Sequence, residues 1–319
     1  MDIFIKAFEN DLSYVKQHMT HLEMSDEKGK TLLHYAVMGN AIDVFDYLLS
    51  LDISVNLMDH HGETPLFDCA RKAKLQLAKR LILKFAKVNV ENRAGELPLH
   101  LASFKGNLDM IKLLIESGSF TNKKSNDDRL PIHYAIAGGQ PSVLKYFIEH
   151  HNQSWEMVDA SGNTLLHHAA KTTNLETIKC LLDHRLDPNA LNHQFETPLF
   201  MAVRFGMKEV LKYLLNNEAL IDIKNRRYET PIDLAQIYNH TDILEVLNEY
   251  MHTPYYQRLK ENQAILLSVL NRDHFQCRKL IEAQTPMKKN RLGKTALDYA
   301  KAYQLPQHIA LLNHWIATE

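Results

Sequence analysis

Histidine and cysteine are the side chains of this chain that could hold a metal ion or act as nucleophile and base, with 18 His and 3 Cys among 319 residues. Zinc-binding helices place two ligands one turn apart on the same face. The adjacent pairs His60-His61, His150-His151 and His167-His168 lack that spacing, and neighbouring helical residues do not share a face. We therefore expect no metal site.

A cysteine could also work with a histidine base, since residues that meet in space need not be close in sequence. Cys69 and Cys180 fall at apolar positions of predicted helices, where a thiol is buried and unreactive. The sequence has neither a glycine-rich phosphate-binding loop nor a nucleophile elbow. It therefore predicts a non-catalytic protein without a cofactor. A thiol-dependent enzyme is the alternative, because Cys277 has no such clear position.

A four-residue signature recurs along the chain. It reads Thr64-Pro65-Leu66-Phe67 in one copy, Leu97-Pro98-Leu99-His100 in the next and Thr197-Pro198-Leu199-Phe200 in a later one. The copies begin at residues 31, 64, 97, 130, 164, 197 and 230. A period this regular predicts a solenoid of stacked units rather than one globular core.

Each unit begins with a turn that leads into a helix. An Asp or Asn precedes most signatures by five residues, and a Gly often follows it, which predicts a tight turn. The Thr of the signature is a good helix N-cap, and Pro at the first helical position loses no hydrogen bond. A small residue then lets neighbouring helices approach closely: Ala36, Cys69, Ala102, Ala135, Ala169, Ala202 or Ala235.

A second helix completes the unit. A Gly or Asn ends the first helix in five copies: Asn40, Gly106, Gly139, Gly206 and Asn239. Apolar residues then recur at helical spacing, as in Val44, Phe45, Leu48 and Leu49. No unit can bury its apolar face alone, so the units must stack.

These motifs closely resemble the ankyrin repeat over nearly the whole chain. The resemblance implies an all-α repeat solenoid, a stack of about nine to ten helix-turn-helix units with hairpin fingers along one edge. It also implies that the signature histidines (His34, His100, His133 and His167) bond the turn and the adjacent repeat. Asn56, Asn89, Asn122 and Asn189 fall at a turn position that can be hydroxylated in similar proteins.

We expect a single ankyrin-repeat domain over residues 1–319. Residues 1–24 form its N-terminal cap, 25–250 seven regular repeats, 251–290 a degenerate repeat and 291–319 a C-terminal capping repeat. In the degenerate stretch, Thr253-Pro254 predicts the start of one long helix that continues through about Asn271. A second helix is expected near Asp273 to Ala283, with no finger before it.

Composition narrows the function classes. The net charge of -1 gives no overall attraction to nucleic acid or to anionic membranes. No apolar run is long enough to span a membrane, and the N-terminus does not have the pattern of a secretory signal. An odd number of cysteines without close spacing indicates a reducing compartment. We expect a cytoplasmic monomer.

The resemblance further implies where a partner binds, namely at the turn residues just before the Thr and near the end of the first helix. In this chain those positions include Met38, Arg71, Lys72, Arg93, Phe104, Lys105, Lys171, Arg204, Phe205, Arg226, Arg227 and Tyr238. The helix positions are basic, aromatic or neutral, and none is acidic. As alternatives, the cations are simply solvated, and Phe104 and Phe205 pack against neighbouring repeats.

We therefore expect a protein-protein interaction scaffold or adaptor whose basic and aromatic groove binds an acidic, partly apolar protein segment. Single-stranded nucleic acid is the alternative ligand, since cations interleaved with aromatics also hold single strands. The richness in Lys, Asn, Ile and His, with Phe67, Phe200 and Asp233 in place of the signature His, looks like the ankyrin proteins that intracellular bacteria deliver into the host cytosol. A eukaryotic cytosolic adaptor is the other possible setting.

Overall fold

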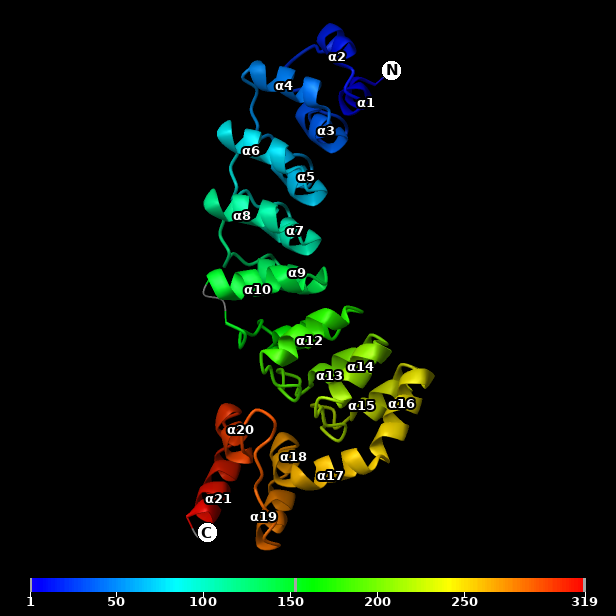
Figure 1. Cartoon of the computed structure of the whole chain (residues 1–319), viewed down its shortest axis with the longest axis vertical. Helices are drawn as coiled ribbons and strands as arrows, with labels where there is room; N and C mark the ends of the chain where they lie inside the picture. Colours follow the sequence, from blue (N-terminus) through cyan, green and yellow to red (C-terminus); the bar gives the residue numbers. More distant parts are fainter. Residues whose placement is uncertain (1, 152–153, 318–319) are drawn as a thin grey trace. The chain divides into compact units, whose positions relative to one another are not determined.

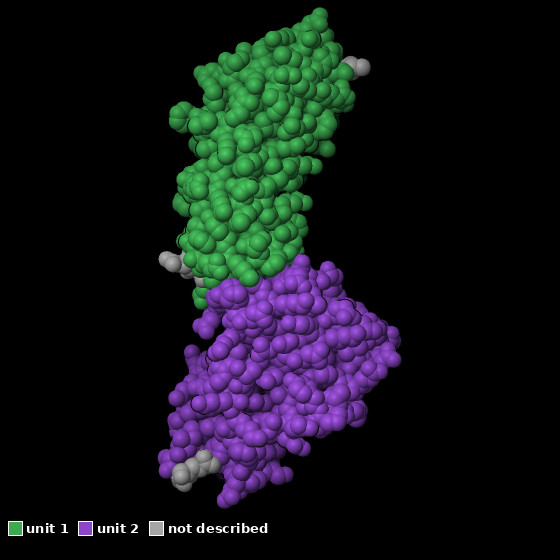
Figure 2. Space-filling model, viewed as in Figure 1, with its two compact units in different colours: residues 1–154 green, residues 155–319 purple. Residues whose placement is uncertain are grey.

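The computed structural model describes residues 2–151 and 154–317. The described residues form 21 α-helices and no β-strand, as expected for an all-α repeat fold (Figure 1). The chain divides into two compact units, residues 1–154 and 155–319, which Figure 2 shows in different colours. We describe each unit by itself.

Unit 1 consists of five helix pairs. Their bounds are α1 Ile3–Phe8, α2 Leu12–His18, α3 Leu32–Gly39, α4 Ile42–Ser50, α5 Pro65–Lys72, α6 Leu75–Leu83, α7 Pro98–Lys105, α8 Leu108–Glu116, α9 Pro131–Ala137 and α10 Pro141–His150. The first helices of successive pairs pack on one another, α1 on α3, α3 on α5, α5 on α7 and α7 on α9. Each helix pair thus covers the apolar face of the next.

Unit 2 has five pairs and one additional helix, α17. Their bounds are α11 Leu165–Ala169, α12 Leu175–Asp183, α13 Pro198–Arg204, α14 Lys208–Leu215, α15 Pro231–Ile237, α16 Thr241–Met251, α17 Pro254–Asn262, α18 Ala264–Leu270, α19 His274–Glu282, α20 Ala296–Ala302 and α21 Pro306–Ile316. Here α11, α13 and α15 pack in succession, and so do α12, α14 and α16.

The helix boundaries follow the sequence signals. Pro65, Pro98, Pro131, Pro198 and Pro231 each open a helix, and the predicted small residues are at most 1% exposed. The predicted helix stops have left-handed backbone conformations, for example φ 56° at Asn40 and 75° at Gly106. Close packing also requires Gly138, because an added Cβ would lie 1.9 Å from the carbonyl oxygen of Phe104.

The predicted threonine cap forms in some repeats only. The hydroxyls of Thr164 and Thr230 accept a hydrogen bond from the backbone N–H three residues on. In contrast, the Thr64 hydroxyl is buried without a hydrogen-bond partner among the described residues. There the N–H of Phe67 donates to the Thr64 carbonyl at 2.9 Å, and phenylalanine offers no polar side chain to complete the cap.

Three of the four signature histidines, His34, His100 and His167, join neighbouring repeats, as the resemblance implied. His167 accepts from the N–H of Thr164 at Nδ1 (3.1 Å), and its Nε2 lies 2.9 Å from the carbonyl oxygen of Glu196 in the next repeat. His34 bonds Thr31 and Glu63 in the same way. Burial lowers the pKa of His167 to about 4, so the imidazole is neutral at physiological pH.

The fingers are tight turns stabilised by their Asp or Asn. In one of them Asn192 Oδ1 accepts from the N–H groups of Gln194 and Glu196 at 2.9 and 3.0 Å. Adjacent fingers are linked through the backbone, for example from the N–H of Arg226 to the carbonyl of Gln194 at 2.9 Å. This linkage fixes the spacing of the side chains that the fingers carry.

The C-terminal part of unit 2 differs from the prediction. The expected long helix after Thr253-Pro254 is interrupted at Gln263, where α17 ends and α18 begins. After α17 the chain does not simply extend the stack. Tyr256 donates to Asp222 Oδ2 at 2.8 Å, and Asn271 Nδ2 donates to the Asp222 carbonyl at 3.0 Å. Thus α17 and the turn after α18, drawn in yellow to orange in Figure 1, contact the loop at Asp222 of an earlier repeat in the same unit.

Candidate functional site

A cleft in unit 2 lies between two fingers and the helices that follow them. It has a volume of about 340 Å³. The lining residues are Gln194, Glu196, Arg204, Asn225, Arg226, Arg227, Glu229, Leu234, Ile237 and Tyr238. The fingers supply residues 194–196 and 225–229, while α13 and α15 supply the floor. The backbone bond between the two fingers holds the cleft open at a fixed width.

Four of the predicted partner-binding residues meet in this cleft: Arg204, Arg226, Arg227 and Tyr238. Arg226 and Arg227 are exposed, and Tyr238 and Ile237 expose 45% and 58% of their surfaces. The cleft thus presents cationic, aromatic and aliphatic groups side by side. Sequence reasoning missed Gln194 and Leu234, because a fingertip glutamine and a helix leucine have no distinctive pattern.

Arg204 does not have a free charge in this cleft. Its Nη2 donates to Glu196 Oε1 at 2.5 Å and its Nη1 donates to Glu196 Oε2 at 3.1 Å. Glu196 is buried, so this bidentate pair ties the finger to α13. The positive charge that remains accessible in the cleft comes from Arg226 and Arg227.

Arg226 is also positioned by an aromatic ring. Its guanidinium lies 4.6 Å from the ring centroid of Phe195, and the guanidinium of Arg272 lies 3.6 Å from the same centroid. Arg272 donates to the Lys224 carbonyl at 2.9 Å, and burial lowers its pKa to about 10. The fingertip is therefore packed against Arg272, two residues after the end of α18.

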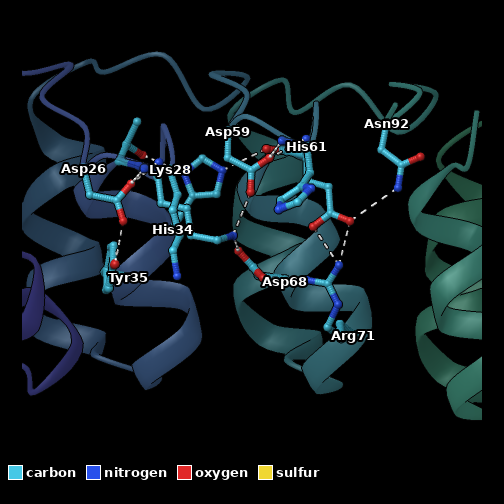
Figure 3. A network of polar contacts seen from close by, with 12 residues as sticks. Asp26, Lys28, His34, Tyr35, Asp59, His61, Asp68, Arg71 and Asn92 are labelled. Atoms are coloured by element: carbon cyan, nitrogen blue, oxygen red, sulfur yellow. Dashed lines mark hydrogen bonds and ion pairs between the residues drawn. The ribbon is translucent and has the colours of Figure 1, made fainter. Parts of the chain in front are cut away.

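In unit 1, Arg71 is engaged in a network that crosses three repeats (Figure 3). It donates to Glu63 at 2.6 and 2.7 Å and to Asp68 at 2.9 Å, and Asn92 of the next repeat donates to Glu63 at 3.3 Å. Lys30 of the preceding repeat lies 2.9 Å from Asp59 and 3.4 Å from Asp68. Arg71 therefore links parts of the fold, and its charge is balanced.

The remaining predicted residues are distributed over both units. Lys72, Arg93 and Lys105 are exposed, whereas Met38 and Lys171 are half-buried. Phe104 and Phe205 are 42% and 48% exposed, so neither ring is covered by its own unit. Lys105 Nζ lies 5.6 Å from the ring centroid of Phe104. None of these side chains lines the cleft of unit 2, and five of them belong to unit 1.

None of the three cysteines is in a disulfide, and all three are buried. Burial raises the pKa of the Cys69 and Cys277 thiols, which disfavours the nucleophilic thiolate. Cys180 Sγ lies 4.0 Å from His184 Nδ1, but that nitrogen is 2.7 Å from the Cys180 carbonyl oxygen and donates its proton there. This histidine is therefore not oriented to act as a base on the thiol.

Metal-binding groups and membrane-spanning helices are described here for residues 2–151 and 154–317. No group of three or more His, Cys, Asp or Glu side chains in these ranges has an arrangement that could hold a metal ion. None of the helices there has the length and the apolar character needed to traverse a membrane.

Comparison with known proteins was made at the levels of sequence and structure. The model of the ankyrin repeat family, described as three copies of the repeat, matches residues 3–92, 66–156, 99–192, 151–225 and 178–257. No curated protein sequence matches the chain significantly. Among solved structures, the ankyrin repeat domain of Bcl-3, described as a unique member of the IκB protein family, is similar with a TM-score of 0.52 and 21% identity. The similarity covers 70% of this chain and all of that domain.

These matches define the family and the fold. At 21% identity the Bcl-3 domain supports the fold alone. Neither match supports the resemblance to bacterial effectors, and neither indicates a catalytic family. Ankyrin repeats are in general non-enzymatic scaffolds that bind other proteins. The family model matches the chain from residue 3 to residue 257, which is well over half of the chain. The chain therefore belongs to the ankyrin-repeat family.

Proposed function

We propose that this protein is a non-catalytic scaffold that binds an acidic, partly apolar segment of a partner protein in the cleft of unit 2. The observation that carries the proposal is the grouping of Arg226, Arg227, Ile237 and Tyr238 on one accessible surface. Arginine and tyrosine are the side chains that most often dominate protein interfaces. Exposed Ile237 supplies an apolar contact beside them.

Charge determines the chemistry of the partner. Arg204 is balanced by Glu196, whereas Arg226 and Arg227 form no salt bridge with any residue that the structure describes. Carboxylates of the partner would pair with these two guanidiniums in a bidentate manner. Two accessible guanidiniums suit a segment with a few carboxylates better than a nucleic-acid backbone, which carries one negative charge per phosphate.

The proposal also includes the oligomeric state of the protein and the compartment in which it works. The scaffold works as a monomer over one repeat domain, residues 1–319, in a reducing compartment. Three buried cysteines that form no disulfide are compatible with that setting. Light scattering of the purified protein measures the oligomeric state, and a stable dimer would overturn this part of the proposal.

The test is an affinity capture from cell lysate with wild type and with Arg227→Glu/Tyr238→Ala. We expect the cleft variant to retain its helix content and to lose at least about tenfold of the affinity for the captured protein. A matched control is Arg278→Glu/Tyr255→Ala, which changes an exposed Arg and a 49% exposed Tyr outside the cleft. Equal capture by all three proteins contradicts the proposal, and capture that nuclease abolishes supports nucleic acid instead.

A further inference from the structure

A second groove lies in unit 1, on the loop that connects α6 to the following finger. It has a volume of about 540 Å³, and its apolar wall includes Ile82, Phe85, Ala86, Val88 and Val90. This groove is separate from the cleft of the proposed function, since it is formed by the other compact unit. None of the twelve predicted partner-binding residues lines it.

Phe85 lies at the rim of this groove, and both its exposure and its backbone conformation are unfavourable for a phenylalanine. Its side chain is 86% exposed, and its backbone φ is 64°, a left-handed conformation in which a side chain is strained. Arg185 and Glu218, at the same position of other repeats, have φ 60° and 68°, and Gly118 has φ 91°. Among these four left-handed residues, Phe85 is the one with a large apolar side chain.

Unit 2 has the equivalent loops, which allows a direct comparison within the chain. The signature at Thr64 recurs at Thr164, so each residue has its equivalent 100 positions later. The structure agrees with this register. Asn89 Nδ2 donates to the Gly118 carbonyl at 2.8 Å, and Asn189 Nδ2 donates to the Glu218 carbonyl at 2.8 Å.

In unit 2 the equivalent groove is filled by the C-terminal part of the chain itself. Tyr299 of α20 donates to Asp187 Oδ2 at 2.5 Å, and Tyr303, one turn later, accepts from the N–H of Leu191 at 2.8 Å. Arg291 donates to Asn217 Oδ1 at 2.7 Å. The groove between these loops therefore accepts a helix that presents aromatic side chains one turn apart.

The two units have opposite charges at one equivalent position of these loops. Lys87 stands in unit 1 where Asp187 stands in unit 2. Lys84 and Lys87 are exposed, and neither forms a salt bridge with a residue in the described part of the chain. Of these two, Lys87 lines the groove, so a helix that enters it meets this cation beside an apolar wall, where unit 2 offers a carboxylate.

We propose that the groove of unit 1 binds a helical segment of a partner protein that carries aromatic or aliphatic side chains next to carboxylates. The apolar side chains pack against Phe85, Val88 and Ile82, and the carboxylates pair with Lys87. The C-terminal helices of a second copy do not fit, because Arg291 and Lys294 would face Lys87.

The probes are two Ala-rich helical peptides with tyrosines one turn apart, flanked by glutamates in one and by lysines in the other. Fluorescence anisotropy measures their binding to the full chain. We expect the glutamate peptide to bind wild type at least about tenfold more tightly than the lysine peptide, and Lys87→Glu to remove this preference. Phe85→Gly should weaken the glutamate peptide about tenfold without loss of helix content.

The control variant is Phe275→Ala, which removes a ring that is 77% exposed on α19, and it should leave binding unchanged. The proposal is overturned if neither peptide binds, if both bind equally, or if Phe85→Gly binds like wild type. It is also overturned if light scattering shows a dimer that Phe85→Gly dissociates. Binding of anionic vesicles that Phe85→Gly abolishes, with no peptide binding, would assign the groove to a membrane surface instead.

Discussion

The Arg204 guanidinium and the Glu196 carboxylate form a bidentate pair at 2.5 and 3.1 Å that connects the first helix of a repeat to its own finger. Arg71 and Glu63 form the same pair in unit 1, at 2.6 and 2.7 Å. In both repeats the arginine is at the end of the helix and the glutamate directly precedes the Thr of the signature. These arginines hold the fingers in place, whereas Arg226 and Arg227 are available to a partner.

The first prediction concerns this pair. Arg204→Met should lower the free energy of unfolding by about 2 kcal/mol, between the values for exposed and fully buried ion pairs, because Glu196 is left buried and unpaired. Urea denaturation followed by circular dichroism measures it. Arg204→Met/Glu196→Gln removes the unpaired charge and should recover part of the loss. A single variant as stable as wild type would show that the pair contributes nothing.

The second prediction is a loss of stability below neutral pH. His167 has a pKa of about 4 in the folded protein and 6.5 as its ordinary value, chiefly because burial disfavours the imidazolium. Between these values the unfolded chain binds the extra proton, so stability is full above pH 6.5 and declines as the pH falls towards 4. The total for this group is on the order of 3 kcal/mol. Burial also lowers the pKa of His34 and His100, which adds to the same trend.

Urea midpoints between pH 7 and pH 4 check this dependence, and His167→Phe provides the comparison. Phe67 and Phe200 occupy the same position in other repeats, so the fold accommodates this ring. The variant should depend less steeply on pH by up to about 1.4 kcal/mol per pH unit. A slope identical to that of wild type would mean that His167 does not titrate differently in the folded and unfolded chains.

The third prediction uses residues in the left-handed conformation. Ala73 ends α5 with φ 57°, at the position where other repeats have Gly or Asn. Ala73→Gly should therefore raise the free energy of unfolding by up to about 1 kcal/mol, because glycine has no Cβ to strain. Phe85→Gly should do the same despite the loss of a large ring, since that ring is mostly exposed. Thermal unfolding checks both variants.

A substitution to alanine, which has a Cβ, separates the effect of backbone strain from the effect of losing the aromatic ring. Phe85→Ala keeps the strained backbone and should give no such gain. If Phe85→Gly is less stable than Phe85→Ala, the ring contributes to the fold, and its exposure in the groove of unit 1 needs another explanation.

The sequence predicts the local features of this fold well, because their physical causes are local. The hydrogen bonds that Asn192 accepts come from its own finger. The left-handed helix stop at Gly106 depends on that one residue. The fold class and the small residues of the first helices followed from the same period. Four predicted cleft residues came together because the repeat fixes their register.

The features that the sequence did not predict depend on contacts between distant residues. Tyr299 and Asp187 are 112 positions apart, and no periodicity relates them. The sequence also did not predict that Glu196 balances the charge of Arg204, because the residue types at the helix positions are basic, aromatic or neutral. Whether an arginine is free or paired is decided by the side-chain geometry of the finger.

The last prediction tests the packing of the C-terminal helices on the loops of unit 2. Asp187 is half-buried, and loss of solvation raises the pKa of its carboxyl while the hydroxyl of Tyr299 and the backbone N–H of Asn189 stabilise the charged form. Tyr299→Phe removes one donor and keeps the ring, so it should lower stability by about 1–3 kcal/mol. Hydrogen exchange followed by mass spectrometry should show faster exchange in α20 and α21. Tyr255→Phe, which changes an exposed hydroxyl, is the control. Unchanged exchange in both helices would mean that the Tyr299 bond does not hold them to the repeats.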